Sequence, residues 1–146
     1  MRKSRKGPFV GLAVLCEKVL TEPDGVTSLI RIIDTVNVQI QPGVSKESVR
    51  PTIPLCVVVM FKSGAVRSKA NVRIVLNDLA GNKIQEISKP LKFGGGERGV
   101  RLVANVSWGF PDEGLYWTDV YVDDDLMTRI PVRVNYRQLE VQTASA

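Results

Sequence analysis

The sequence predicts an all-β protein, an antiparallel Greek-key β-sandwich of about eight strands with an immunoglobulin- or C2-like architecture. Short runs of alternating or β-branched apolar residues are separated by glycine-, proline- and aspartate-containing turns at roughly regular spacing. No segment shows a convincing amphipathic helical period. In addition, residues 112–116 have the D-x-G-x-Y form of a tyrosine corner, which is typical of Greek-key sandwiches.

The first half of the chain contains three predicted strands, at residues 9–20, 26–40 and 53–61. Residues 22–25 separate the first two strands, because Pro23 and Gly25 stand where a tight type I turn favours them. The second strand is rich in β-branched residues, and the polar segment 41–52, with two prolines, is the longest connection. The third strand contains the unbroken apolar run 55–61, which predicts that both of its faces are covered.

The second half contains five predicted strands, at residues 70–77, 83–93, 100–108, 115–123 and 126–137. The strands at 70–77 and 100–108 alternate cleanly between apolar and polar residues, so we expect one buried face in each. Pro90 makes the strand at 83–93 an edge candidate, and Gly94 to Gly96 form a flexible connector. Even-numbered residues are the buried set in the last two strands.

The register of the last hairpin follows from this shared parity, since directly opposed residues lie on one face of a sheet. A three-residue loop of Asp123, Asp124 and Asp125 places even-numbered residues of the two strands opposite each other, whereas a two-residue loop does not. The predicted pairs are Val122 with Leu126, Tyr116 with Val132 and, on the outer face, Asp119 with Arg129.

The outer face of this hairpin is the strongest candidate functional site. Large apolar groups alternate there with arginines, a composition that is enriched in protein interfaces. Either another part of the chain, such as the N-terminal segment, covers this face, or a protein partner or a second copy of the chain binds it. The predicted partner-binding residues are Leu115, Trp117, Tyr121, Arg129 and Arg133.

Four basic residues, Arg2, Lys3, Arg5 and Lys6, account for most of the formal net charge of +5. They define a basic arm at 1–8, followed by a single domain at 9–137 and a tail at 138–146. The arm is either a solvated start of the chain or a site for an anionic polymer such as nucleic acid. Because the rest of the chain is nearly neutral, nucleic acid is the weaker candidate partner.

The composition argues against an enzyme, because the chain has no histidine and only two cysteines, Cys16 and Cys56, in apolar surroundings. The aspartates at 123–125 and the glycine-rich stretch 94–99 are better explained as turns than as calcium or phosphate sites. We therefore expect no cofactor and no metal. A carbohydrate-binding sandwich with Trp108 or Trp117 as the sugar platform is a further alternative.

The apolar runs are too short to cross a bilayer, and no convincing secretion signal precedes them, which predicts a cytoplasmic protein without a membrane partner. Segments 16–20, 24–26, 28–34, 113–117, 119–122 and 128–132 resemble a family of small, uncharacterised bacterial proteins. The resemblance covers most of the chain outside the basic arm. It implies a single all-β domain and carries over no catalytic or ligand residues.

Overall fold

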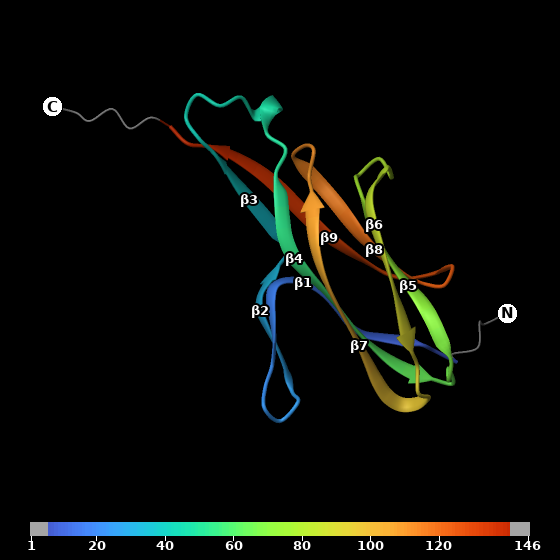
Figure 1. Cartoon of the computed structure of the whole chain (residues 1–146). Coiled ribbons are helices and arrows are strands. Elements are labelled where there is room, and N and C mark those ends of the chain that lie inside the picture. Colours follow the sequence, from blue (N-terminus) through green and yellow to red (C-terminus); the bar gives the residue numbers. More distant parts are fainter. Residues whose placement is uncertain (1–5, 141–146) are drawn as a thin grey trace.

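The computed structural model describes residues 6–140, in which nine strands form two stacked sheets, as the predicted sandwich requires (Figure 1). A short 3-10 helix, η1 (Lys46–Ser48), lies in the longest connection. The strands are β1 (Phe9–Thr21), β2 (Thr27–Ile33), β3 (Thr35–Ile40), β4 (Thr52–Gly64), β5 (Lys69–Asn77), β6 (Lys83–Lys92), β7 (Gly96–Gly109), β8 (Gly114–Val122) and β9 (Asp125–Gln138).

The first sheet has the strand order β2-β1-β4-β7 and the second has the order β3-β9-β8-β5-β6. The orders β1-β4-β7 and β9-β8-β5-β6 correspond to strands A-B-E and G-F-C-C′ of an immunoglobulin-type sandwich. Thr118 stands where an immunoglobulin domain has its second conserved cysteine, and the topology forms without that disulfide. The predicted edge strand with Pro90, now β6, lies at one end of the second sheet.

The predicted continuous strand at 26–40 is wrong, because the chain changes sheets in its middle. β2 pairs with β1 in the first sheet, whereas β3 pairs in parallel with β9 in the second. Asp34 makes the crossing, and its carbonyl accepts a 3.0 Å hydrogen bond from the backbone N–H of Arg133. A β-branched run indicates extended backbone but does not say which sheet it joins, so nine strands replace the expected eight in residues 6–140.

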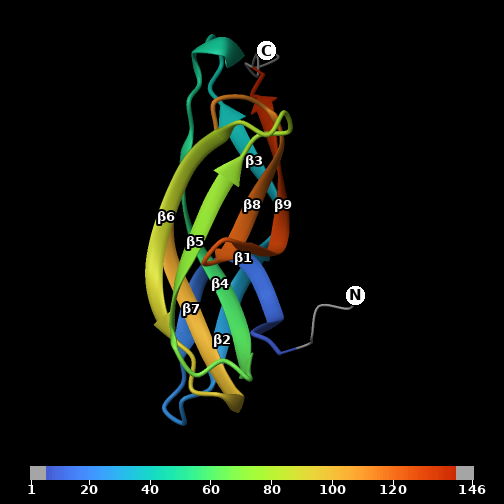
Figure 2. The same cartoon turned by 90° about the vertical axis from the view of Figure 1, so that its right-hand side faces the viewer.

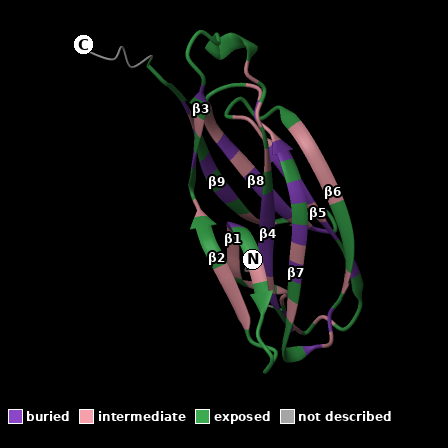
Figure 3. Cartoon of the chain, turned by 60° about the vertical axis from the view of Figure 1, so that its left-hand side comes forward, coloured by how far each residue is buried: buried purple, intermediate pink, exposed green. Residues whose placement is uncertain are grey.

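The main core lies between the two sheets and follows the predicted alternation (Figure 3). The even-numbered apolar side chains of residues 70–77 and 100–108 point into it, with Val100 half-buried and the others buried. In β4 the residues from Leu55 to Val59 are all buried, so both faces of this strand are covered, as its apolar run predicts. The second sheet covers the inner face of β4, and a smaller apolar cluster around Val58 covers the outer one.

The tyrosine corner forms as predicted at the start of β8. The buried Tyr116 hydroxyl donates to the carbonyl oxygen of Asp112 at 2.7 Å and accepts from the Asp112 N–H at 3.1 Å. These bonds tie the connection between β7 and β8 to the strand that follows it.

The predicted register of the last hairpin is correct in the strands and wrong at the turn. Tyr116 pairs with Val132 and Asp119 with Arg129, but an irregularity after Val120 brings Val122 opposite Asp125 instead of Leu126. The loop therefore has two residues, and Leu126 is 49% exposed instead of buried. A bulge shifts the parity by one residue, and the regular alternation of the sequence does not reveal it.

The first strand, β1, begins at Phe9, and the last strand, β9, ends at Gln138, one residue into the proposed tail. Of the four arm residues, Arg2, Lys3 and Arg5 lie outside the described residues, and Lys6 is exposed. Within residues 6–140, no helix has the length and apolar character needed to cross a membrane.

Candidate protein-binding face

The predicted partner-binding residues lie together on the outer surface of the second sheet, on strands β8 and β9 (Figure 2). Leu115, Trp117 and Tyr121 are partly exposed, and Arg129 and Arg133 are exposed. The ladder places Leu115 opposite Arg133. We call the outward-facing residues of these two strands and their neighbours on β5 and β6 the hairpin face.

One half of the hairpin face is organised around Asp119, which is only 5% exposed although it points outward. Its carboxylate accepts hydrogen bonds from Arg129 Nε at 2.7 Å and from Asn77 Nδ2 at 2.9 Å. The Arg129 guanidinium also lies over the Trp117 ring, 4.6 Å from its centroid. Hence Arg129 is held in place by a carboxylate and an aromatic ring together.

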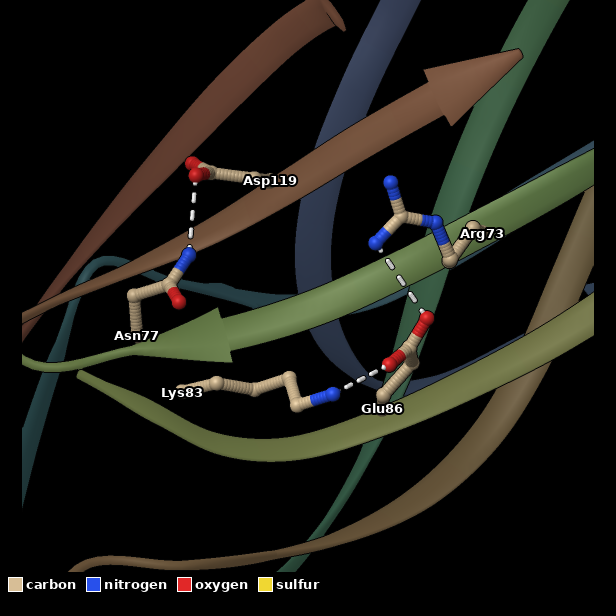
Figure 4. A network of polar contacts seen from close by, with 5 residues as sticks. All are labelled: Arg73, Asn77, Lys83, Glu86 and Asp119. Atoms are coloured by element: carbon tan, nitrogen blue, oxygen red, sulfur yellow. Dashed lines mark hydrogen bonds and ion pairs between the residues drawn. The ribbon is translucent and has the colours of Figure 1, made fainter. Parts of the chain in front are cut away.

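The other half contains a second arginine–aromatic pair. The Arg73 guanidinium lies 4.3 Å from the centroid of the Tyr121 ring and 3.3 Å from a carboxylate oxygen of Glu86. Lys83 Nζ contacts the other carboxylate oxygen at 2.8 Å (Figure 4). The hydrogen bond from Lys83 is the main cause that lowers the pKa of Glu86, with a smaller contribution from Arg73.

The face carries more positive than negative charge. Asp119 and Glu86 neutralise two of its cations, whereas Arg133 and Arg137 have no ion-pair partner within residues 6–140. Arginines without a carboxylate, on the same face as two rings stacked under other arginines, favour contact with an acidic surface.

Within the described chain no element packs over the hairpin face, so the expectation that the N-terminal segment covers it is not met there (Figure 2). The carbonyl of Lys6 instead accepts a 2.6 Å hydrogen bond from the N–H of Ala65, which ties this part of the chain to the connection between β4 and β5.

Sequence reasoning missed Arg73, Val75 and Glu86. Alternation places Arg73 on the outward side of its strand, but nothing in the sequence says that β5 lies beside β8. Val75 is 4% exposed although it faces outward, opposite Asp119 in one neighbouring strand and Glu86 in the other. The only available signal was an apolar residue at an outward position of a strand that otherwise alternates.

The two tryptophans that the sequence offers as sugar platforms differ in their exposure. Trp108 is 1% exposed and belongs to the main core, so it is excluded as a binding surface. The Trp117 ring is partly exposed, but Arg129 lies over it.

The aspartates of the last hairpin turn and the two cysteines have structural roles. Asp123 forms the hairpin turn with φ 51°, and its carboxylate accepts a 3.0 Å hydrogen bond from the Asn71 N–H. Residues 6–140 contain no group of three or more side chains arranged to hold a metal ion. Cys16 and Cys56 are buried free thiols, and they lie in the outer cluster around Val58 and not in the main core.

These features define the class of the protein: an immunoglobulin-like β-sandwich of two sheets. The chain belongs to the family of unknown function DUF6941, whose family model matches residues 11–135. No curated protein matches the sequence.

Two solved structures are similar over most of this chain. A β-glucosidase from Listeria innocua in complex with glucose is 14% identical, with a TM-score of 0.49 over 88% of this chain and 16% of its own. An immunoglobulin-like protein from Pseudomonas aeruginosa is 11% identical, with a TM-score of 0.46 over 90% of this chain and 99% of its own. The present chain thus spans only a small part of the β-glucosidase.

Proposed function

We propose that the protein is a non-enzymatic binding module and that an acidic protein surface docks on the hairpin face. The observation that carries this proposal is the combination of two arginine-stacked rings with two arginines that have no acidic partner in residues 6–140. Aromatic residues and arginine dominate the binding energy of protein interfaces, and a partner carboxylate would meet Arg133 without a new buried unpaired charge.

The stacked arginines also reduce the cost of binding. Arg129 and Arg73 are already fixed by Asp119 and Glu86, so their side chains lose less conformational freedom when a partner arrives. The surface is therefore preorganised, and the charge of the exposed arginines accelerates encounter with an acidic partner.

The test compares partner recovery by the wild-type chain and by the double variant Trp117→Ala with Arg133→Glu. We expect recovery from a lysate of the source cells to fall by about tenfold or more, since loss of an aromatic anchor and reversal of a charge each cost over about 1 kcal/mol at an interface. Raising the salt concentration should weaken the wild-type interaction as well.

A matched control replaces an exposed apolar residue and a cation elsewhere, Leu20→Ala with Lys18→Glu on the β1–β2 hairpin. This variant should retain partner recovery. If the two double variants recover the same proteins in the same amounts as the wild-type chain, the hairpin face is not the binding surface.

A further inference from the structure

The β1–β2 hairpin does not continue the plane of the first sheet, and its outer half bends over that sheet (Figure 1). The bend lies at Glu17 and Arg31, which form a 2.8 Å ion pair, and Arg31 has φ 55°. Beyond the bend Val19 and Leu29 pack against the outer cluster of Cys16, Cys56 and Val58. We call residues 18–30 the flap.

A groove remains between the tip of the flap and the outer face of the first sheet. The Arg101 guanidinium of β7 donates a hydrogen bond to the Thr27 hydroxyl on the flap, so the far strand of the sheet reaches the flap tip. The groove is mainly apolar at one side and cationic at the other. Its lining on the sheet includes Gly11, Leu12, Met60, Lys62, Gly99 and Arg101.

The register of the sheet determines how the lining side chains are arranged in rows across β1, β4 and β7. Leu12, Met60 and Arg101 form one row across β1, β4 and β7, because Met60 pairs with both of the others. Lys62 lies opposite Gly99 in the next row. The position of Gly99 is thus flanked by Lys62 across the ladder and by Arg101 two residues along the same face of β7.

Neither backbone conformation nor space within the chain requires glycine at position 99. Its φ is outside the left-handed region, and an added Cβ would meet only ordinary contacts, 3.7 Å from Lys62 Nζ and from the Phe61 carbonyl oxygen. A glycine inside a strand often marks a point where a ligand approaches the backbone closely. Here the absence of a side chain at Gly99 leaves the backbone accessible between Lys62 and Arg101.

In the described residues, no carboxylate lies within ion-pair distance of either cation. Neither Lys62 nor Arg101 has an ion-pair partner in residues 6–140, and the hydrogen bonds that they donate go to the Glu97 carbonyl and the Thr27 hydroxyl. Leu12 and Met60 are partly exposed beside them. The arrangement complements a molecule with a negative group at one end and an apolar group at the other.

We propose that this groove binds a small amphipathic anion, an organic carboxylate or sulfonate that carries an apolar group. The anionic group lies over Gly99 between Lys62 and Arg101, and the apolar group lies over Met60 and Leu12 beneath the flap tip. The site is on the opposite sheet from the hairpin face, so it is independent of the proposed partner surface.

The probe for this site is 8-anilinonaphthalene-1-sulfonate, whose fluorescence rises on binding. We expect a saturable titration by the folded wild-type chain with a dissociation constant below about 1 mM. The variant Gly99→Val fills the anion position with a residue that suits a strand, and should weaken binding by about tenfold or more. The double variant Lys62→Gln with Arg101→Gln should weaken it comparably, and most strongly at low salt.

The matched control is Ser107→Val, on the same outward face of β7 but away from the groove, and it should change affinity less than about twofold. The hairpin-face double variant Trp117→Ala with Arg133→Glu should also bind the probe normally. Circular dichroism confirms that each variant is folded; if Gly99→Val does not fold, the Lys62 and Arg101 variant decides.

Three results would overturn the proposal. The first is the absence of saturable binding by the wild-type chain. The second is unchanged affinity in folded Gly99→Val or in the double glutamine variant. The third is an equal loss of affinity in the Ser107→Val or hairpin-face control, which would show that the probe binds the surface without regard to the groove.

Discussion

At the scale of single residues, the buried hydroxyls of Tyr116 and Thr118 differ in their hydrogen bonding. The Tyr116 hydroxyl makes two hydrogen bonds with the backbone of Asp112, whereas the Thr118 hydroxyl is fully buried and has no hydrogen-bond partner within residues 6–140. A buried polar group stabilises the fold when it is paired and costs free energy when it is not.

Tyr116→Phe should therefore destabilise the protein. Removal of the hydroxyl leaves the N–H and the carbonyl of Asp112 without this partner, at a cost of about 1–2 kcal/mol in the free energy of unfolding. Urea denaturation measures the change. Tyr121→Phe, at a surface ring whose hydroxyl is not part of a corner, is the control and should stay within about 0.5 kcal/mol of wild type.

Thr118→Val, in contrast, should increase the free energy of unfolding. Valine keeps the branched shape and removes the unpaired hydroxyl, so we expect stabilisation of about 1 kcal/mol. The same exchange at the exposed Thr35 should change stability by less than about 0.5 kcal/mol. A Thr118→Val variant that unfolds at lower urea than wild type would contradict this interpretation.

The pH dependence of stability follows from three buried acids. Burial is the main cause that raises the pKa of Cys16 above 9.0 and the pKa values of Tyr116 and Tyr136 above 10.0. Their contribution to stability is complete below the pKa of the unfolded chain. It is lost as the pH rises toward the folded pKa, because the unfolded chain releases these protons first.

We therefore expect Tm to be constant between about pH 6 and 9 and to fall by several degrees between about pH 9 and 11. Thermal unfolding followed by circular dichroism checks this prediction. Cys16→Ala should have a shallower decline at the lower end of that range. A Tm that is unchanged at about pH 10.5 would rule out the three groups as buried acids.

At the scale of elements, the free edge of β7 is covered by side chains of β6. Gln85 donates to the Ser107 carbonyl oxygen at 3.0 Å and accepts a hydrogen bond from the Gly109 N–H, and Lys89 donates to the Val103 carbonyl oxygen at 3.2 Å. These bonds join the edges of the two sheets. They also satisfy backbone groups that could otherwise pair with a strand of another chain.

Gln85→Ala should destabilise the protein by about 1–2 kcal/mol, because two backbone groups of β7 lose their partners. It should also accelerate amide hydrogen exchange at Gly109 relative to other residues of β7. Ser88→Ala, at an exposed position of the same strand, is the control. Equal exchange at Gly109 in Gln85→Ala and wild type would show that Gln85 does not protect this edge.

Alternation within a strand predicted burial well, and pairing between strands less well. Tyr116, Thr118, Val120 and Val122 are buried as expected, since a period of two follows from the pleat of a single strand. Leu126 is exposed because a bulge between β8 and β9 changes the parity. The switch between sheets at Asp34 was likewise hidden, because both halves of that run have the same apolar character.

At the scale of the whole molecule, one core joins both sheets. Main-core residues come from both sheets, and the parallel pairing of β3 with β9 connects an early segment with the last strand. Neither sheet can bury its apolar face without the other, so the domain should unfold as one cooperative unit.

The two tryptophans allow a test of this cooperativity. Trp117→Phe leaves the buried Trp108 as the single tryptophan, and its fluorescence then reports on the core. We expect the urea midpoint from fluorescence to coincide with the midpoint from far-ultraviolet circular dichroism. Two separate midpoints would show that the sheets unfold independently.

The candidate site was predicted in part. The outward placement of Leu115, Trp117 and Arg133 follows from alternation alone, and the opposition of Asp119 and Arg129 follows from the hairpin register. The contributions of Arg73 and Glu86 depend on the adjacency of β5, β6 and β8.

The sequence by itself determined the class of fold, the buried face of each regular strand and the tyrosine corner. Each of these depends on residues close in the chain, through the pleat of a strand or the hydrogen bonds of a turn. The tertiary structure alone decided which strands are neighbours, where the chain changes sheets and how the flap bends over β4. These features depend on contacts between distant segments, for which a single sequence gives no local signal.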